Sequence, residues 1–206
     1  VDLNNKGFCN HQHSNFYALN DQSYANSQGC QPIAYKCDSY DNYNRGLCAD
    51  CGTATEKHCV PMELSLDYWD DKSNWITNQG INHFYINTGS AITDGYCLNT
   101  YQVVVVTDDP TCSGQMQLEL SEGYNIAMTL SSANEIKTPI TGKTGYTALF
   151  ANPKILSASF SVKLDGQNNI NCKVNEIDFN YMSNNDESIR QKLSAVLKST
   201  DGGNFS

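Results

Sequence analysis

The chain has 206 residues and a formal net charge of −9, and only 17% of its residues are charged. A chain this acidic lacks the basic surface that neutralises phosphates, which argues against nucleic acid as a partner. Its longest apolar run, residues 103–106, has the length of a strand and falls far short of the roughly 20 residues that span a bilayer. We therefore expect no transmembrane segment. The abundant Asn, Ser, Thr and Gln favour turns and strands over helices.

Nine cysteines are present, and six of them lie within the first 59 residues. Because the number is odd, pairing within the chain leaves at least one sulfur over, either free or bonded elsewhere. Abundant cysteine favours an oxidising, extracellular compartment. Residue 1 is Val rather than Met, and no signal-like segment follows it. We therefore expect mature, secreted material.

Hydrophobic periodicity differs between the two halves of the chain. Residues 1–70 have little of it, and we expect mostly loops held by disulfides, with a short helix at 14–19. A connector at 71–95 ends in a predicted strand at 83–87. From residue 101, β-rich runs separated by Gly, Asp, Asn or Pro turns predict strands at 101–107, 116–120, 126–130, 146–150, 156–164 and 174–181.

These runs indicate a β-sandwich. Apolar and polar side chains alternate at 116–120 and 158–164, so each run presents one apolar face. A one-residue slip in the alternation of 174–179 indicates a bulge. Six such strands in about a hundred residues are typical of a sandwich. Residues 186–198 fit either a helix capped by Asp186 or a final strand, and periodicity does not decide between them.

Nine segments carry a further signal in their order and spacing along the chain. The first four are Cys9-Asn10-His11-Gln12-His13-Ser14, Cys37-Asp38-Ser39-Tyr40, residues 46–51 and Cys59-Val60-Pro61-Met62. The other five are residues 84–89, Cys97, and residues 101–105, 179–181 and 188–190. In this order and spacing they resemble the C-terminal half of the pancreatic-type neutral lipase family. The resemblance implies a mainly β chain. Residues 1–90 would be a disulfide-rich C-terminal remnant of an α/β-hydrolase domain, and residues 91–206 a PLAT-like β-sandwich. Because the remnant lacks its central sheet, we expect an obligate partner, a separate N-terminal chain of the same precursor.

Within that resemblance His11 matches the triad histidine, the general base that takes the proton from a serine nucleophile. His13 stands where the family usually has an arginine. The sequence contains no Gly-x-Ser-x-Gly nucleophile elbow, and the aspartate that orients the histidine belongs to the family's other half. We expect no catalysis from this chain alone. A serine ester hydrolase would require a partner chain that supplies Ser and Asp.

The cysteines allow more than one interpretation. The resemblance implies the disulfides Cys37–Cys48 and Cys51–Cys59, and it leaves Cys9 to bond the N-terminal chain or, alternatively, to tether a ligand. Cys48, Cys51, His58 and Cys59 also have the spacing of a zinc site, but disulfides are the default in a secreted chain. The loop aspartates at 67, 70, 71, 108 and 109 could bind calcium. Solvated charge is the commoner meaning of such residues, and we expect no metal.

Four aromatic residues lie near the expected domain boundary, Trp69, Trp75, Phe84 and Tyr85. They could line an apolar groove for a flat ligand, or simply pack two domains together. We favour a non-enzymatic chain that, with the N-terminal chain, binds, carries or stores a hydrophobic ligand such as a lipid, a carotenoid or a bilin. Lipase-like yolk proteins illustrate such a role in the family. The alternative is the C-terminal chain of a proteolytically nicked triacylglycerol lipase or phospholipase, with His11 in its triad.

Overall fold

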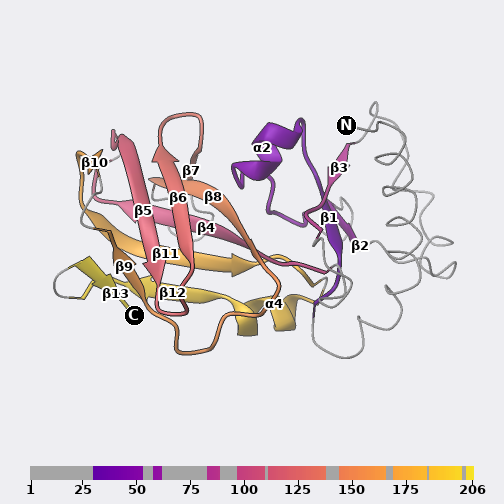
Figure 1. The fold of residues 1–206 in the computed structure, drawn as a ribbon. Helices are drawn as coiled ribbons and strands as arrows, with labels where there is room; N and C mark the ends of the chain where they lie inside the picture. Colours follow the sequence, from indigo (N-terminus) through magenta and orange to yellow (C-terminus); the bar gives the residue numbers. More distant parts are fainter. Residues whose placement is uncertain are drawn as a thin grey trace, which may run out of the picture.

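The computed structural model describes residues 30–52, 58–61, 83–88, 97–109, 111–137, 144–165, 169–184, 186–200 and 203–206. Within these residues the protein is mainly β, with strands arranged in three antiparallel sheets and two short helices. Two five-stranded sheets stack face to face, and a three-stranded sheet with helix α2 lies to one side (Figure 1). The mainly β fold class expected from the sequence is confirmed.

The first five-stranded sheet has the strand order β12-β11-β4-β8-β7. Its strands are β4 (Asn99–Thr107), β7 (Glu135–Lys137), β8 (Thr144–Asn152), β11 (Val174–Tyr181) and β12 (Ala195–Lys198). In β4 the four consecutive valines at 103–106 are all buried, because this central strand is covered on both faces. The register between β11 and β4 shifts between Val174 and Glu176, which confirms the expected bulge.

The second five-stranded sheet is built around β5 (Gly114–Leu120). This strand pairs with β6 (Asn125–Leu130), β9 (Val162–Leu164) and β10 (Asn169–Ile170), and β13 (Asn204–Phe205) pairs with β9. Burial alternates strictly along β6 and nearly so along β5. One face of this sheet therefore points toward β4 and β11, and the other faces solvent.

The main hydrophobic core fills the space between the two five-stranded sheets. Val103 and Ile177 of the first sheet and Leu118 of the second are fully buried in it. Phe160 meets Phe179 edge-on, with ring centroids 4.9 Å apart. Burying a side chain of this size stabilises the fold by roughly 1.5–3 kcal/mol. The disulfide Cys112–Cys172 closes one end of the same core.

The small sheet has β1 (Ile33–Lys36) at its centre, between β2 (Cys59–Pro61) and β3 (Phe84–Tyr85). Helix α2 (Tyr40–Asn44) follows β1 and begins after Ser39, whose hydroxyl accepts a hydrogen bond from the Asn42 N–H. Tyr35 faces a second core cluster, while Ala34 and Val60, which pair on the opposite face, are buried as well. The small sheet is therefore covered on both faces.

One prediction needs correction. The predicted strand at 156–164 is wrong before Val162, because Glu122 accepts a hydrogen bond from the Ser157 N–H and Phe160 N–H bonds back to Ser157, which makes a turn. Among the described residues of the segment expected to be mostly loop, three short elements are present, β1, α2 and β2. The tail, for which helix and strand were both open, contains both in succession, α4 (Glu187–Leu193), capped by Asp186, and then β12.

Two further expectations concern helices. The short helix expected at 14–19 lies outside the residues that the structure describes. In the described part of the chain, no helix has the length and apolar character needed to cross a membrane.

Candidate functional site

The candidate site is the junction, by which we mean the contact between residues 30–61 and the two five-stranded sheets. Helix α2 and the loop after it lie against the outer face of the first sheet, close to β8 (Figure 1). Two polar side chains lie on that face: Gln102 of β4, which is half-buried, and Thr147 of β8, which is buried. They bond the loop after α2.

Both of these hydrogen bonds reach backbone carbonyls. Thr147 Oγ1 donates to the carbonyl oxygen of Arg45 at 2.5 Å, and Gln102 Nε2 donates to that of Gly46 at 2.6 Å. Gly46 has a φ of +77°, and a Cβ added there would lie 3.1 Å from the carbonyl oxygen of Ala148. The junction therefore needs glycine at this position, both for its backbone conformation and for the close approach to β8.

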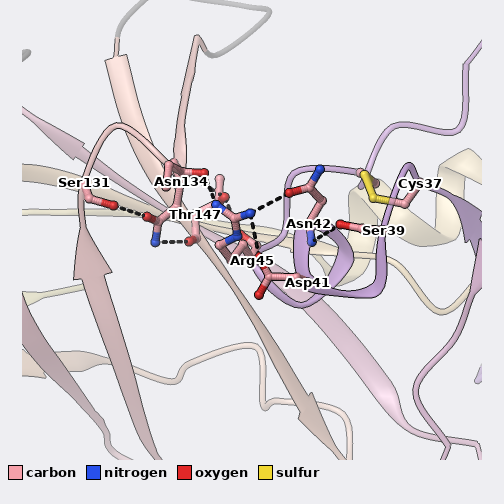
Figure 2. Close-up of polar contacts among 10 residues, drawn as sticks. Cys37, Ser39, Asp41, Asn42, Arg45, Ser131, Asn134 and Thr147 are labelled. Carbon is pink, nitrogen blue, oxygen red and sulfur yellow. Dashed lines mark hydrogen bonds and ion pairs between the residues drawn. A yellow bond between two sulfur atoms is a disulfide. The ribbon is translucent and has the colours of Figure 1, made fainter.

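The Arg45 side chain extends the junction to the turn between β6 and β7 (Figure 2). Its Nη1 donates to the carbonyl oxygen of Ala133 at 2.7 Å, and its Nη2 donates to Asn42 Oδ1 at 2.6 Å. Nη2 also pairs with Asp41 at 2.7 Å, but that side chain is 78% exposed, and exposed ion pairs contribute only about 0–1 kcal/mol. Asn134 orders the turn, since its Nδ2 donates to a β6 carbonyl at 2.5 Å. The hydrogen bond from Arg45 to the Ala133 carbonyl therefore connects the end of α2 to this ordered turn.

A second part of the junction lies just after β11. Tyr35 Oη donates to the carbonyl oxygen of Met182 at 2.8 Å, and the Gln31 N–H donates to that of Ser183, also at 2.8 Å. Met182 is buried in the same cluster as Tyr35. The disulfide Cys30–Cys97 adds a covalent link between the start of β1 and the start of β4. The small sheet is therefore attached to the sandwich at two separated places.

Arg190 of α4 contacts the disulfide Cys51–Cys59, which lies beside the small sheet. Its Nη1 donates to the Asn184 carbonyl oxygen at 3.1 Å and lies 3.2 Å from Cys51 Sγ. Burial raises the pKa of Tyr35 well above its usual value, and the nearby Arg190 charge opposes this only in part. The Tyr35 hydroxyl therefore stays protonated and keeps donating to the sandwich.

Tyr40, Tyr43, His83 and Tyr85 form what we call the aromatic cluster. Tyr85 is within 6.3 Å of each of the other three rings, measured between centroids. Tyr43 is buried, which raises its pKa to about 12, although a backbone hydrogen bond from Asn87 acts in the opposite direction. Tyr40 is 54% exposed. The cluster therefore has a buried base and an aromatic edge open to solvent.

The proposed ligand-groove residues are only partly covered by this description. The structure places Tyr85 in the aromatic cluster and Phe84 beside it in β3, both half-buried. Trp69 and Trp75 lie outside the described residues, as do His11, the candidate general base, and Cys9, the candidate interchain cysteine. The predicted catalytic and interchain roles therefore concern residues outside the described part of the chain and stay predictions.

The eight described cysteines form four disulfides, Cys30–Cys97, Cys37–Cys48, Cys51–Cys59 and Cys112–Cys172. The second and third are the pairs that the family resemblance implied, and the other two pairings were open. Because Cys48, Cys51 and Cys59 are bonded to other cysteines, their sulfurs present no thiolates, and the alternative of a zinc site is wrong.

The two described aspartates of this set accept backbone or side-chain hydrogen bonds nearby. Asp108 accepts a hydrogen bond from the Lys173 N–H, and Asp109 accepts two from Thr111 at 2.7 Å. The Thr111 bonds lower the pKa of Asp109. The Asp109 carboxylate therefore orders the turn before Cys112, and the Asp108 carboxylate ties the end of β4 to the segment before β11. The aspartates at 67, 70 and 71 lie outside the described residues.

Sequence reasoning missed Arg45, Gln102 and Thr147 as junction residues. A signal existed for two of them, since Gln102 and Thr147 are polar residues inside otherwise apolar β runs. A buried polar side chain requires a hydrogen-bond partner, which marks such positions as contact sites. Arg45 gave no comparable signal, because its contact across the junction is to a backbone carbonyl, that of Ala133, which no side chain in the sequence marks.

Comparisons with known proteins add a family-level finding. No family model matches the chain. The chain is 29% identical to Lipase member H of rabbit (Oryctolagus cuniculus) over 99 residues, which are 48% of this chain and 20% of that protein. It is 31% identical to the rat (Rattus norvegicus) protein of the same name over 99 residues, with the same coverage. For zebrafish (Danio rerio) Lipase member H the identity is 28% over 116 residues, or 56% of this chain and 24% of that protein. The chain matches a quarter or less of these relatives' length, and the likeness supports a relationship to the lipase family.

Proposed function

We propose that this chain is the C-terminal part of a secreted lipase-like protein and is bonded through Cys9 to a separate N-terminal chain. One observation carries the proposal. Eight of the nine cysteines in the sequence pair with one another, so Cys9 has no cysteine left to pair with inside the chain. In an oxidising compartment such a cysteine bonds another molecule or stays free.

The small sheet supports the assignment of residues 1–90 to the end of an α/β-hydrolase domain. An antiparallel sheet standing alone usually exposes one face, so a small sheet covered on both faces must pack against further chain on each side, as the edge of a larger domain would. Ala34 and Tyr35 are both buried although they point to opposite faces. The stacked five-stranded sheets then correspond to a PLAT-like sandwich at residues 91–206, docked on that domain through the junction.

For activity, we favour binding of a hydrophobic ligand over ester hydrolysis. The aromatic cluster supplies a wall of the kind that ligand sites at domain interfaces use. This chain has no Gly-x-Ser-x-Gly segment, and His13 departs from the family pattern beside His11. Lipid, carotenoid or bilin would suit an aromatic wall.

The second candidate is a nicked lipase, and the names of the relatives favour it. In that case His11 would accept the proton of a serine carried by the N-terminal chain, and the sandwich would hold the two chains in register.

The chain pairing is tested on the native protein by gel electrophoresis with and without reductant. We expect the 206-residue chain to appear at its own mass only after reduction. In a recombinant precursor, Cys9→Ser should release the partner without reductant. The double variant Cys112→Ser/Cys172→Ser, which removes an intrachain disulfide of the sandwich, should leave the chains linked. A native mass that reduction does not change would contradict the proposal.

The two activities are separated by an absorption spectrum and an organic extraction of the native protein. Visible absorption bands or co-extracted lipid in stoichiometric amount would support carriage. Ester hydrolysis that a serine-reactive phosphonate blocks, and that His11→Ala abolishes, would establish the enzyme and overturn the carrier.

A further inference from the structure

Strand β13 carries the one Asn-x-Ser/Thr sequon of the sequence, Asn204-Phe205-Ser206. We propose that Asn204 is a site of N-linked glycosylation. The sequon alone is a weak signal, because many sequons lie in buried or unsuitable positions. The structure adds the placement of its three residues, and the proposal rests on that placement.

The strand presents both reactive positions of the sequon on the surface. Phe205 is 1% exposed and packs in the main core, whereas Asn204 and Ser206 on either side of it are exposed. Since side chains alternate between the faces of a strand, Asn204 and Ser206 share the outer face. Lys163, the cross-strand neighbour of Asn204, is exposed on that face too. A large, polar, branched substituent can therefore extend from Asn204 into solvent without displacing a core side chain.

Main-chain hydrogen bonds hold the backbone of β13. Asn204 and Phe205 pair with Lys163 and Val162 of β9, and Ser206 exchanges two backbone hydrogen bonds with Lys198. These bonds use main-chain atoms only. A glycan on the Asn204 amide thus leaves every one of them intact, and we expect the fold to tolerate it.

The site is also remote from the junction. In Figure 1, β13 lies at the end of the sandwich that points away from β1, β2, β3 and α2. A glycan at this end would cover neither the aromatic cluster nor the contacts of Arg45. Modification of Asn204 is therefore compatible with an N-terminal chain bound at the small sheet.

The chemistry requires a lipid-linked oligosaccharide diphosphate as co-substrate, which the secretory pathway provides. The Asn204 Nδ2 attacks C1 of the first sugar, a C–N bond forms, and the C1–O bond to the lipid diphosphate breaks. The diphosphate leaves with the electron pair, and the amide loses one proton to a base. The proposal rests on secretion, which is itself part of the proposed function.

A matched control exists within the same sandwich. Asn125-Ile126-Ala127 in β6 has the same pattern of an exposed Asn, a buried apolar residue and an exposed third residue, but it lacks the hydroxyl that a sequon needs. Ala127→Thr would complete a sequon there. Asn125 should be unmodified in the natural protein and glycosylated in this variant.

The test is peptide mapping by mass spectrometry of the native protein, before and after treatment with a peptide N-glycan amidase. We expect the peptide that contains Asn204 to carry hexosamine and hexose, and enzymatic release to convert Asn204 to aspartate. In protein secreted from eukaryotic cells, Asn204→Gln and Ser206→Ala should both abolish the modification, whereas Ser206→Thr should retain it. Secreted protein with an unmodified Asn204, in a host that modifies the Ala127→Thr variant at Asn125, would overturn the proposal and leave the proposed function intact. Native protein found only in the cytosol would overturn both.

Discussion

Gly46 is the position at which the junction is most sharply testable by substitution. Its φ of +77° lies in the left-handed region, where an alanine costs roughly 1–2 kcal/mol. Alanine also lowers the conformational entropy of the unfolded chain, which offsets about 0.4–1 kcal/mol of that loss of stability. From backbone conformation alone, Gly46→Ala should therefore destabilise the protein by about 1 kcal/mol.

Close packing adds a second cost at Gly46. The new Cβ would meet the Ala148 carbonyl oxygen at 3.1 Å, its carbonyl carbon at 3.2 Å and Thr147 Cβ at 3.3 Å. Two of these atoms belong to the backbone of Ala148, which is paired with Val103 in the central strand β4 and cannot yield easily. Forcing such a shift typically costs about 1–3 kcal/mol. The total expected loss is then about 2–4 kcal/mol.

Gly123 provides the control for Gly46. Its φ is +86°, but a Cβ there would meet no atom within 4 Å. Gly123→Ala should therefore lose only the conformational part, about 1 kcal/mol. Urea unfolding followed by far-ultraviolet circular dichroism, with the disulfides intact, measures both losses, and each kcal/mol should lower Tm by about 2–4 °C in a chain of this size. Equal losses for the two variants would refute the close approach between the α2 loop and β8.

Three further changes test other parts of the fold. Thr147→Val should cost about 1–3 kcal/mol in urea unfolding, because the Arg45 carbonyl loses the donor of a partly buried hydrogen bond, whereas Thr147→Ser should cost less; equal losses would contradict the role of the hydroxyl. Phe179→Ala should cost about 3–5 kcal/mol in the same assay through the cavity it leaves, and a loss below 1 kcal/mol would contradict its place in the core. Burial raises the pKa of Tyr43 and Tyr101 from 10.0 to about 12. Their protonated hydroxyls therefore contribute their full share to the free energy of unfolding below pH 10, and this share is lost as the pH rises toward 12. Titration of tyrosinate absorbance should show these two ionising late, and ionisation near pH 10 in the folded protein would contradict their burial.

Much of the sandwich could be predicted from the sequence because several of its strands bury only one face. Where apolar residues alternate with polar ones, as in β5 and β6, the period of two is visible in the sequence alone. Alternation failed as a guide at 156–161, where Phe160 is buried from a turn rather than from a strand. Side chains can reach a core from irregular backbone, and the sequence pattern does not record the difference.

The small sheet was much harder to predict. In β1 three consecutive residues, Ile33 to Tyr35, are buried because both faces are covered, so no alternation marks the strand. The junction posed a different difficulty, since Gln102 and Thr147 meet Arg45 and Gly46 only through the tertiary fold. A sequence can mark a polar residue inside an apolar run, but it does not say which loop will satisfy it.

The junction combines three kinds of attachment, and together they bear on function. Flexible domain contacts are usually polar and small, whereas this one includes partly buried hydrogen bonds from Thr147 and Gln102 and the packing of Met182 beside Tyr35. It also includes the Cys30–Cys97 disulfide, which spans 67 residues and on chain-entropy grounds is worth about 4 kcal/mol. The sandwich is therefore held rigidly against the small sheet and α2, and is not a domain on a flexible linker. The aromatic cluster belongs to the small sheet and α2, so the fixed junction holds this cluster at a constant position relative to the sandwich, and such a preformed geometry is what the proposed ligand wall would require.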